Sequence, residues 1–128
     1  MPDRGFRLLG ATALLLGLGA AAPHLAQAHA SLNKCNIAPA AKLAAAPKLI
    51  TCTFAEGVNP KRSFIGVFET TGDHAEVDKE NSAVSFANAK AMTVSVPKLS
   101  KGTYALLWYT ISADDGHRAG GTFTFSIK

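Results

Sequence analysis

The sequence predicts an all-β domain, a β-sandwich or Greek-key barrel of about seven short strands. Three observations favour this fold. Short segments that alternate apolar and polar residues recur along the chain. Glycine, proline and asparagine separate these segments at the spacing of an all-β fold. The one stretch with helix propensity, residues 40–46, is too short to form a stable helix and ends at Pro47.

Residues 1–28 have the features of a secretory signal peptide. Two arginines give a positive start, residues 8–22 form an apolar run, and Ala26-Gln27-Ala28 is a cleavage pattern. The apolar run is shorter than the roughly 20 residues that a transmembrane helix needs, although an uncleaved membrane anchor is the alternative interpretation. We therefore expect export, cleavage after Ala28 and a mature domain that spans residues 29–128.

The first half of the mature domain predicts three strands, at residues 30–37, 49–54 and 63–69. In the second of these, Ile50, Cys52 and Phe54 share one face, because side chains alternate along a strand. The alanine-rich stretch between Pro39 and Pro47 is expected to be a loop.

The second half predicts four more strands, at residues 84–86, 92–96, 104–111 and 122–127. The polar, acidic segment 70–82 before them is expected to be an exposed loop. Both faces of strand 104–111 are apolar, which favours a central position in a sheet. Trp108 is the expected core anchor of this strand. Tyr104, after Leu99 and Gly102, resembles a tyrosine corner, in which the hydroxyl bonds back to the preceding turn.

The charge of the mature domain is mild. Without Arg4, Arg7 and Asp3 the chain keeps 11 basic and 8 acidic residues, and the lysines are scattered. A small excess spread in this way is an ordinary protein surface, so we expect no binding to nucleic acid.

Cys35 and Cys52 are the only two cysteines. After export to an oxidising compartment, an even number of cysteines favours a disulfide, which would join the first two predicted strands. The alternative is a thiol pair that binds a soft metal such as Cu(I).

The connection between the last two predicted strands contains Asp114, Asp115 and His117. A carboxylate two residues before an imidazole can form a metal-ligand pair, because both side chains converge when the loop curls. An Asp-Gly-His sequence is also typical of a hairpin turn with a surface histidine, so the loop alone leaves both interpretations open. His74, in the acidic segment, is interpreted as a solvated loop residue.

Cleavage after Ala28 would make His29 the first residue and create a free amino group. The amino nitrogen and Nδ1 of an N-terminal histidine can close a chelate ring on one metal once the amine has lost its proton. Such a pair suits Cu(II), which favours nitrogen ligands in a square or tetragonal plane, and an imidazole from elsewhere would complete a T of nitrogens.

These features together resemble the CopC family of small copper-resistance proteins. The matching positions are His29-Ala30, Pro39-Ala40, the segment 49–54 with Glu56 and Val58, then Leu99, Gly102, Tyr104, Trp108, Ser112, the motif Asp115-Gly116-His117, Gly121, Phe123 and Phe125. Each match is short, but their order spans nearly the whole mature domain.

The resemblance implies a seven-stranded Greek-key β-barrel, Ig-like or cupredoxin-like in appearance, with a Cu(II) site at the mature N-terminus. At the matching positions, His29 supplies its amino nitrogen and imidazole, His117 a second imidazole, and Asp115 a carboxylate oxygen. Glu56 matches an acid near the site, whose expected role is to orient the ligands. Asp114 is interpreted as solvated or as a cap of the turn.

The resemblance also implies a function. We expect a periplasmic Cu(II) carrier or buffer in copper resistance and homeostasis, a monomer without enzymatic activity that works with an inner-membrane, CopD-like copper transport protein. Some relatives have a separate Cu(I) site rich in methionine, but Met92 is the only methionine of the mature domain and is expected to be a strand residue. We therefore expect only the Cu(II) site.

Two other functions use the same sequence features. Copper-dependent polysaccharide monooxygenases also bind copper through an N-terminal histidine. The short chain, and an Asp115 oxygen where oxygen chemistry needs an open position, argue against that activity. A metal-free, Ig-like structural module is the remaining alternative.

Overall fold

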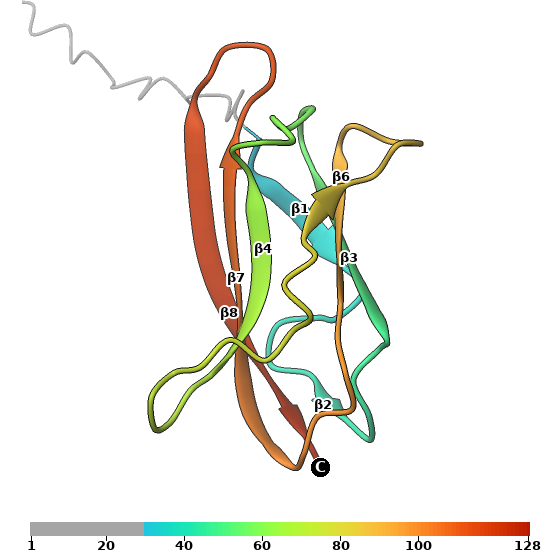
Figure 1. Ribbon diagram of the computed structural model, residues 1–128, viewed down its shortest axis with the longest axis vertical. Helices are drawn as coiled ribbons and strands as arrows, with labels where there is room; N and C mark the ends of the chain where they lie inside the picture. Colours follow the sequence, from blue (N-terminus) through green and yellow to red (C-terminus); the bar gives the residue numbers. More distant parts are fainter. Residues whose placement is uncertain (1–29) are drawn as a thin grey trace, which may run out of the picture.

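The computed structural model describes residues 30–128 as two four-stranded β-sheets (Figure 1). The strands are β1 (Leu32–Cys35), β2 (Lys42–Leu43), β3 (Leu49–Phe54), β4 (Phe64–Glu69), β5 (Ala83–Val84), β6 (Ala91–Ser95), β7 (Gly102–Ile111) and β8 (Arg118–Ile127). The predicted signal peptide and His29 lie outside the described residues. Within residues 30–128 no helix is long and apolar enough to cross a membrane.

The order of strands is β1-β3-β6-β5 in the first sheet and β2-β8-β7-β4 in the second. Neighbouring strands are antiparallel except β2 and β8, which are parallel. The all-β prediction is confirmed. Strand β2 was not among the predicted strands, because two residues in an alanine-rich segment carry no alternating pattern. It forms only because the chain passes beside the end of β8.

The core lies between the inward faces of the sheets. Its largest fully buried side chains are Phe54, Phe125, Ile37, Ile50, Ile65, Met92, Leu106 and Ile111. The predicted common face of Ile50, Cys52 and Phe54 is confirmed, and it is the inward face of β3, since each of the three is at most 1% exposed. Met92 is fully buried on β6, which confirms its interpretation as a strand residue.

Strand β7 lies between β8 and β4, so its predicted central position is confirmed. Only one of its faces is covered by the other sheet, because Leu107 and Tyr109 on the outer face are among the exposed hydrophobic residues. On the inner face, Trp108 is half-buried and its ring lies 5.8 Å from that of Phe54. The Tyr104 hydroxyl donates a hydrogen bond of 2.7 Å to the carbonyl of Ser100, which confirms the tyrosine corner.

The expectation that segment 70–82 is entirely exposed is wrong at Asp78, which is buried. Strand β4 is an edge of its sheet, and its free N–H groups need acceptors. The Val67 N–H donates to Asp78 Oδ2 at 2.8 Å, and the Val77 N–H donates to the Val67 carbonyl at 2.8 Å. The segment therefore covers the edge of β4.

The predicted disulfide is confirmed, since Cys35 on β1 and Cys52 on β3 are bonded and face each other in the antiparallel register. The two cysteines are therefore not available as thiolate ligands for Cu(I). Since Cys52 is fully buried, the bond fastens the first strand of the domain to the core.

Candidate metal centre

The connection between β7 and β8, residues 112–117, closes one end of the sandwich (Figure 1). Backbone bonds fix its shape: the Ser112 N–H donates to the His117 carbonyl at 2.8 Å, and the Gly116 N–H donates to the Ser112 carbonyl at 3.0 Å. Gly116 has a φ of +71°, a left-handed conformation that glycine adopts without steric cost. The loop is thus curled, which is the condition under which the side chains of Asp115 and His117 can converge.

Asp115 and His117 form a pair within this loop. Asp115 Oδ2 lies 2.8 Å from His117 Nδ1, and Asp115 Oδ1 accepts a hydrogen bond of 3.0 Å from the His117 N–H. The side chains remain accessible, 36% exposed for the aspartate and 60% for the histidine. Both oxygens of one carboxylate therefore orient one histidine, through its backbone and its ring.

The same contacts change the acidity of the carboxyl group. The hydrogen bond from the His117 side chain, followed by that from its backbone N–H, lowers the pKa of Asp115 from 3.8 to about 2. Asp115 is therefore ionised throughout the physiological range, and it presents a negative charge beside the imidazole.

Glu56 approaches the loop from the turn after β3. Its Oε2 accepts a hydrogen bond of 2.8 Å from the Ser112 hydroxyl, whose oxygen accepts a weaker one of 3.3 Å from the Asp114 N–H. The Ala113 N–H also donates to the Gly57 carbonyl at 2.9 Å. Glu56 thus holds the start of the loop.

The described chain begins beside this loop. Ala30 is fully buried, and its carbonyl accepts a hydrogen bond of 2.6 Å from the hydroxyl of Thr110, near the end of β7. The next carbonyl, that of Ser31, accepts a bond of 2.9 Å from the Ala55 N–H. The first described residue is therefore fixed between the strand that leads into the His117 loop and the turn that carries Glu56.

Among residues 30–128, no group of three or more histidine, cysteine, aspartate or glutamate side chains could hold a metal ion. The structure pairs Asp115 with His117 and links Glu56 to the loop through Ser112. The predicted further ligand, His29, lies outside the described residues. His74 is exposed in the 70–82 segment, as expected, with Nδ1 3.2 Å from the Glu69 carbonyl.

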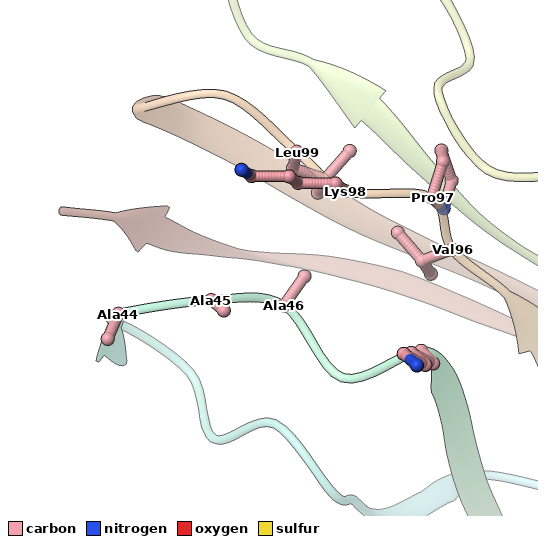
Figure 2. A pocket seen from close by; sticks show the side chains of 8 residues that line it. Ala44, Ala45, Ala46, Val96, Pro97, Lys98 and Leu99 are labelled. Carbon is pink, nitrogen blue, oxygen red and sulfur yellow. The ribbon is translucent and has the colours of Figure 1, made fainter.

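An apolar cleft of about 280 Å³ lies between two segments at the end of the sandwich opposite this loop (Figure 2). It is lined by Ala44, Ala45, Ala46, Lys48, Val96, Pro97, Lys98 and Leu99. None of these side chains is of a type that commonly binds copper in proteins. The cleft is therefore not part of the candidate metal centre.

Two residues of the centre had no predicted role. Thr110 was only one position of the predicted strand 104–111, and Ser112 was only one position of the family resemblance. One feature of the sequence does point to Thr110. Its hydroxyl lies on the same strand face as three large apolar residues, Tyr104, Leu106 and Trp108. A buried hydroxyl needs a partner, but the sequence does not reveal that the partner is Ala30.

Comparison with known proteins finds relatives whose names refer to copper. A family model described as the CopC domain matches residues 32–128. The chain is 33% identical over 106 residues to the copper transport protein CutJ of Bacillus subtilis, a match that covers 82% of this chain but only 19% of that longer protein. It is also 33% identical over 102 residues to the protein YobA of Escherichia coli K12, covering 79% of this chain and 80% of YobA.

Two solved structures share the fold. CopC from Methylosinus trichosporium OB3b superposes with a TM-score of 0.66 and 26% identity, covering 78% of this chain and 94% of that one. PcoC, a methionine-rich copper resistance protein from Escherichia coli, superposes with a TM-score of 0.65 and 27% identity, covering 79% and 100%. None of the names of these similar proteins describes an enzymatic activity.

Proposed function

The chain belongs to the CopC family, and from this premise we propose that it is a periplasmic copper-binding protein that carries or buffers Cu(II). The observation that carries the proposal is the bond from Thr110 to Ala30, which fixes the start of the described chain beside the Asp115–His117 pair. The family and the names of its copper-related members support copper as the metal, and the geometry of this loop supports the location that we propose for it.

The first ligand we propose is His29, as the N-terminal residue after cleavage at Ala28. His29 is bonded to Ala30, and the carbonyl of Ala30 is fixed to Thr110 near the end of β7, which supports the choice of His29 as a ligand. The amine and imidazole of His29 would bind copper together after losing their protons. A free amine arises only if nothing precedes His29, which makes the processing of the chain part of the proposal.

The second ligand we propose is His117, bound through Nε2. Its Nδ1 contacts the carboxylate of Asp115, and a carboxylate in that position typically fixes the tautomer and orientation of a metal-binding imidazole. Each oxygen of Asp115 already accepts one hydrogen bond from His117, but a carboxylate has further lone pairs, so a direct bond from Asp115 to copper stays a prediction. In either role the ionised carboxylate adds negative charge, which favours Cu(II) over Cu(I).

We propose that Glu56 acts indirectly, by holding Ser112 at the start of the loop. Met92, the only methionine within residues 30–128, is fully buried and cannot serve an accessible thioether site. The donor set near the loop is thus nitrogen and oxygen, which fits Cu(II) better than Cu(I).

We propose further that copper passes between this protein and an inner-membrane copper transport protein. CutJ, named as a copper transport protein, is a longer chain of which the match covers only 19%. A similar domain can thus be part of a larger copper transport protein. A separate domain of this kind would meet its transport partner by diffusion, as a monomer.

The test is a Cu(II) titration of the chain that begins at His29, followed by electron paramagnetic resonance. We expect binding at one equivalent, with the signal of nitrogen ligands in a tetragonal plane. The matched control is the same chain with one extra residue before His29, which removes the free amine of the histidine and leaves residues 30–128 unchanged. We expect its affinity for Cu(II) to fall by more than about tenfold.

Equal affinity of the two chains would show that the His29 amine is not a ligand. If His117→Ala binds as tightly as the unaltered chain, the β7–β8 loop is not the copper site. Failure of every form to bind at one equivalent would reject copper binding as the function.

A further inference from the structure

We infer that the apolar cleft at the end of the sandwich opposite the β7–β8 loop binds a small aliphatic carboxylate. Its two walls are residues 44–46, which follow β2, and residues 96–99, which follow β6 (Figure 2). The volume of about 280 Å³ is close to the lower end of the range of small-molecule sites, roughly 300–1,000 Å³. The inference goes beyond copper binding and does not depend on the proposed copper site.

Two prolines separate the walls of the cleft. The antiparallel pairing of β3 with β6 ends where the Val96 N–H donates to the Lys48 carbonyl at 2.9 Å. One residue further, the same register would place Pro47 opposite Pro97. Proline fixes φ at about −65°, whereas an antiparallel strand has a φ of about −140°. Each segment therefore leaves the strand geometry at its proline, and the cleft lies between them.

The surface of the cleft is mainly apolar. Val96 and Leu99 line it and are buried in the core, and Ala46 packs against the same core. The methyl group of Ala46 points across the gap toward the opposite wall (Figure 2). An alkyl chain placed between the walls would be removed from water on both sides, which is favourable in proportion to the apolar area buried.

Both walls are anchored at their far ends. The Leu43 carbonyl, just before the first wall, accepts a hydrogen bond of 2.8 Å from the Lys128 N–H. The second wall ends at the buried Leu99, and the next carbonyl, that of Ser100, accepts the bond from the Tyr104 hydroxyl. The walls are thus in place before a ligand arrives, so binding does not have to order them.

The charged residues in the lining are two lysines, Lys48 and Lys98. Both are exposed, and within residues 30–128 neither ammonium group forms an ion pair or a hydrogen bond. Figure 2 shows the Lys98 side chain extended along one wall. Two unpaired positive charges at an apolar surface favour a ligand that has a negative charge and an apolar part.

The acidic residues of the described chain lie elsewhere. Residues 30–55 and 81–113, which supply both walls, contain no acid. Of the 8 acids, three are at the opposite end of the sandwich and the others lie within residues 69–80. The end of that acidic segment approaches β6 on the edge away from β3, where the Lys79 N–H donates to the Ser95 carbonyl at 2.9 Å. The charge at the cleft is therefore positive.

The arrangement of these groups favours a carboxylate on an alkyl chain. Lys98 lies between Pro97 and Leu99, so the positive charge directly borders the apolar lining. A carboxylate can be paired by ammonium groups alone, whereas a bound phosphate commonly takes backbone N–H donors as well, and Pro97 has none. The small volume fits one alkyl chain, and we therefore choose a free fatty acid of medium length as the ligand.

The experiment is an NMR titration of the chain that begins at His29 with decanoate, decanol and acetate. We expect decanoate to shift the amide signals of Val96 and Leu99, with an affinity that weakens as salt is added. Decanol has the chain without the charge, so its binding should not depend on salt. Acetate has the charge without the chain and should shift neither signal.

Variants separate the two parts of the site. The double variant Lys48→Gln, Lys98→Gln should bind decanoate about tenfold more weakly and decanol unchanged. The matched control is Lys61→Gln, at an exposed lysine of the connection between β3 and β4, which lies at the other end of the molecule (Figure 1). Ala46→Leu should weaken both ligands by about tenfold or more, because its added carbons occupy the cleft. A melting curve shows whether each variant is folded.

Three results would overturn the inference. Decanoate leaves the Val96 and Leu99 signals in place, the folded lysine double variant binds decanoate as tightly as the unaltered chain, or Lys61→Gln is equally impaired. A short peptide of leucine and glutamate is titrated in parallel. If that peptide shifts the two signals and decanoate does not, the cleft is a site for a protein segment and the inference is wrong.

Discussion

The hydroxyl of Thr110 donates a 2.6 Å hydrogen bond to the carbonyl of Ala30, across 80 positions of sequence, and both residues are fully buried. This bond connects the first described residue to the strand that ends at the candidate metal loop. Together with the bond from the Ala55 N–H to the Ser31 carbonyl, it holds the start of the described chain beside the strand that leads to His117. A buried carbonyl left without a donor costs about 1–3 kcal/mol, so the contact also matters for stability.

Thr110→Val keeps the shape of the side chain and removes the donor. We expect a loss of about 1–2 kcal/mol in the free energy of unfolding and a fall of about tenfold in Cu(II) affinity. Thr122→Val is the matched control, because its hydroxyl donates a similar bond of 2.9 Å to the Leu106 carbonyl. Denaturant unfolding measures the free energy of unfolding of both variants, and copper titration measures their Cu(II) affinity. Equal copper affinities for the two variants would contradict a role for Thr110 in positioning the chain start.

Gly116→Ala should disturb the copper site through the backbone. The φ of Gly116 is +71°, and an alanine in a left-handed conformation costs about 1 kcal/mol. Gly72→Ala is a close control, since its φ is +63° and an added Cβ would meet nothing within 4 Å at either glycine. Both variants should lose similar stability in thermal melts, while only Gly116→Ala should weaken Cu(II) binding. The hypothesis fails if the Gly72 variant loses as much affinity.

Glu76→Gln should change how stability depends on pH. Desolvation by burial, followed by the hydrogen bond and charge of Asp78, raises the pKa of Glu76 from 4.5 to about 7. Its Oε1 is buried, with no hydrogen-bond partner in the described part of the chain. Between about pH 4.5 and 7 the folded chain therefore holds a proton that the unfolded chain has lost, so stability falls as the pH rises.

Glutamine removes this titration without adding charge. We expect Glu76→Gln to melt at a higher temperature than the unaltered chain above pH 7, and the difference to vanish below about pH 4.5. Asp73→Asn, at an exposed acid of the same segment, should leave the profile unchanged. A difference in melting temperature that is constant across this pH range would show that titration of Glu76 is not its cause.

Loss of the Cys35–Cys52 disulfide should destabilise the domain. The bond closes a loop of 17 residues, and the chain-entropy model gives about 3 kcal/mol for a loop of this size. We expect a reductant to lower the melting temperature by about 10 °C or more. The Cys35→Ala, Cys52→Ala double variant should already melt at the lower temperature and should not respond to reductant. If reductant lowers both melting temperatures equally, its effect does not come from this bond.

The sequence by itself predicted the fold class and most strands, and it favoured the disulfide from the number of cysteines and the expected export. The strands and the tyrosine corner are visible in short windows: alternating residues define β3 and β6, and Leu99, Gly102 and Tyr104 signal the corner that the Tyr104 hydroxyl forms. The sequence also indicated Asp115 and His117 as a candidate pair, because side chains two residues apart converge when the loop that carries them curls. Such features depend on local backbone geometry.

Only the tertiary structure decided the contacts between distant segments. The Thr110–Ala30 bond, the burial of Asp78 against β4 and the pairing of β2 with β8 each join segments whose relation is set by how the sheets pack. Periodicity shows which face of a strand is buried, but it does not show which polar group lies opposite. A buried polar group must find its partner wherever packing brings one, and that partner is fixed by the fold as a whole.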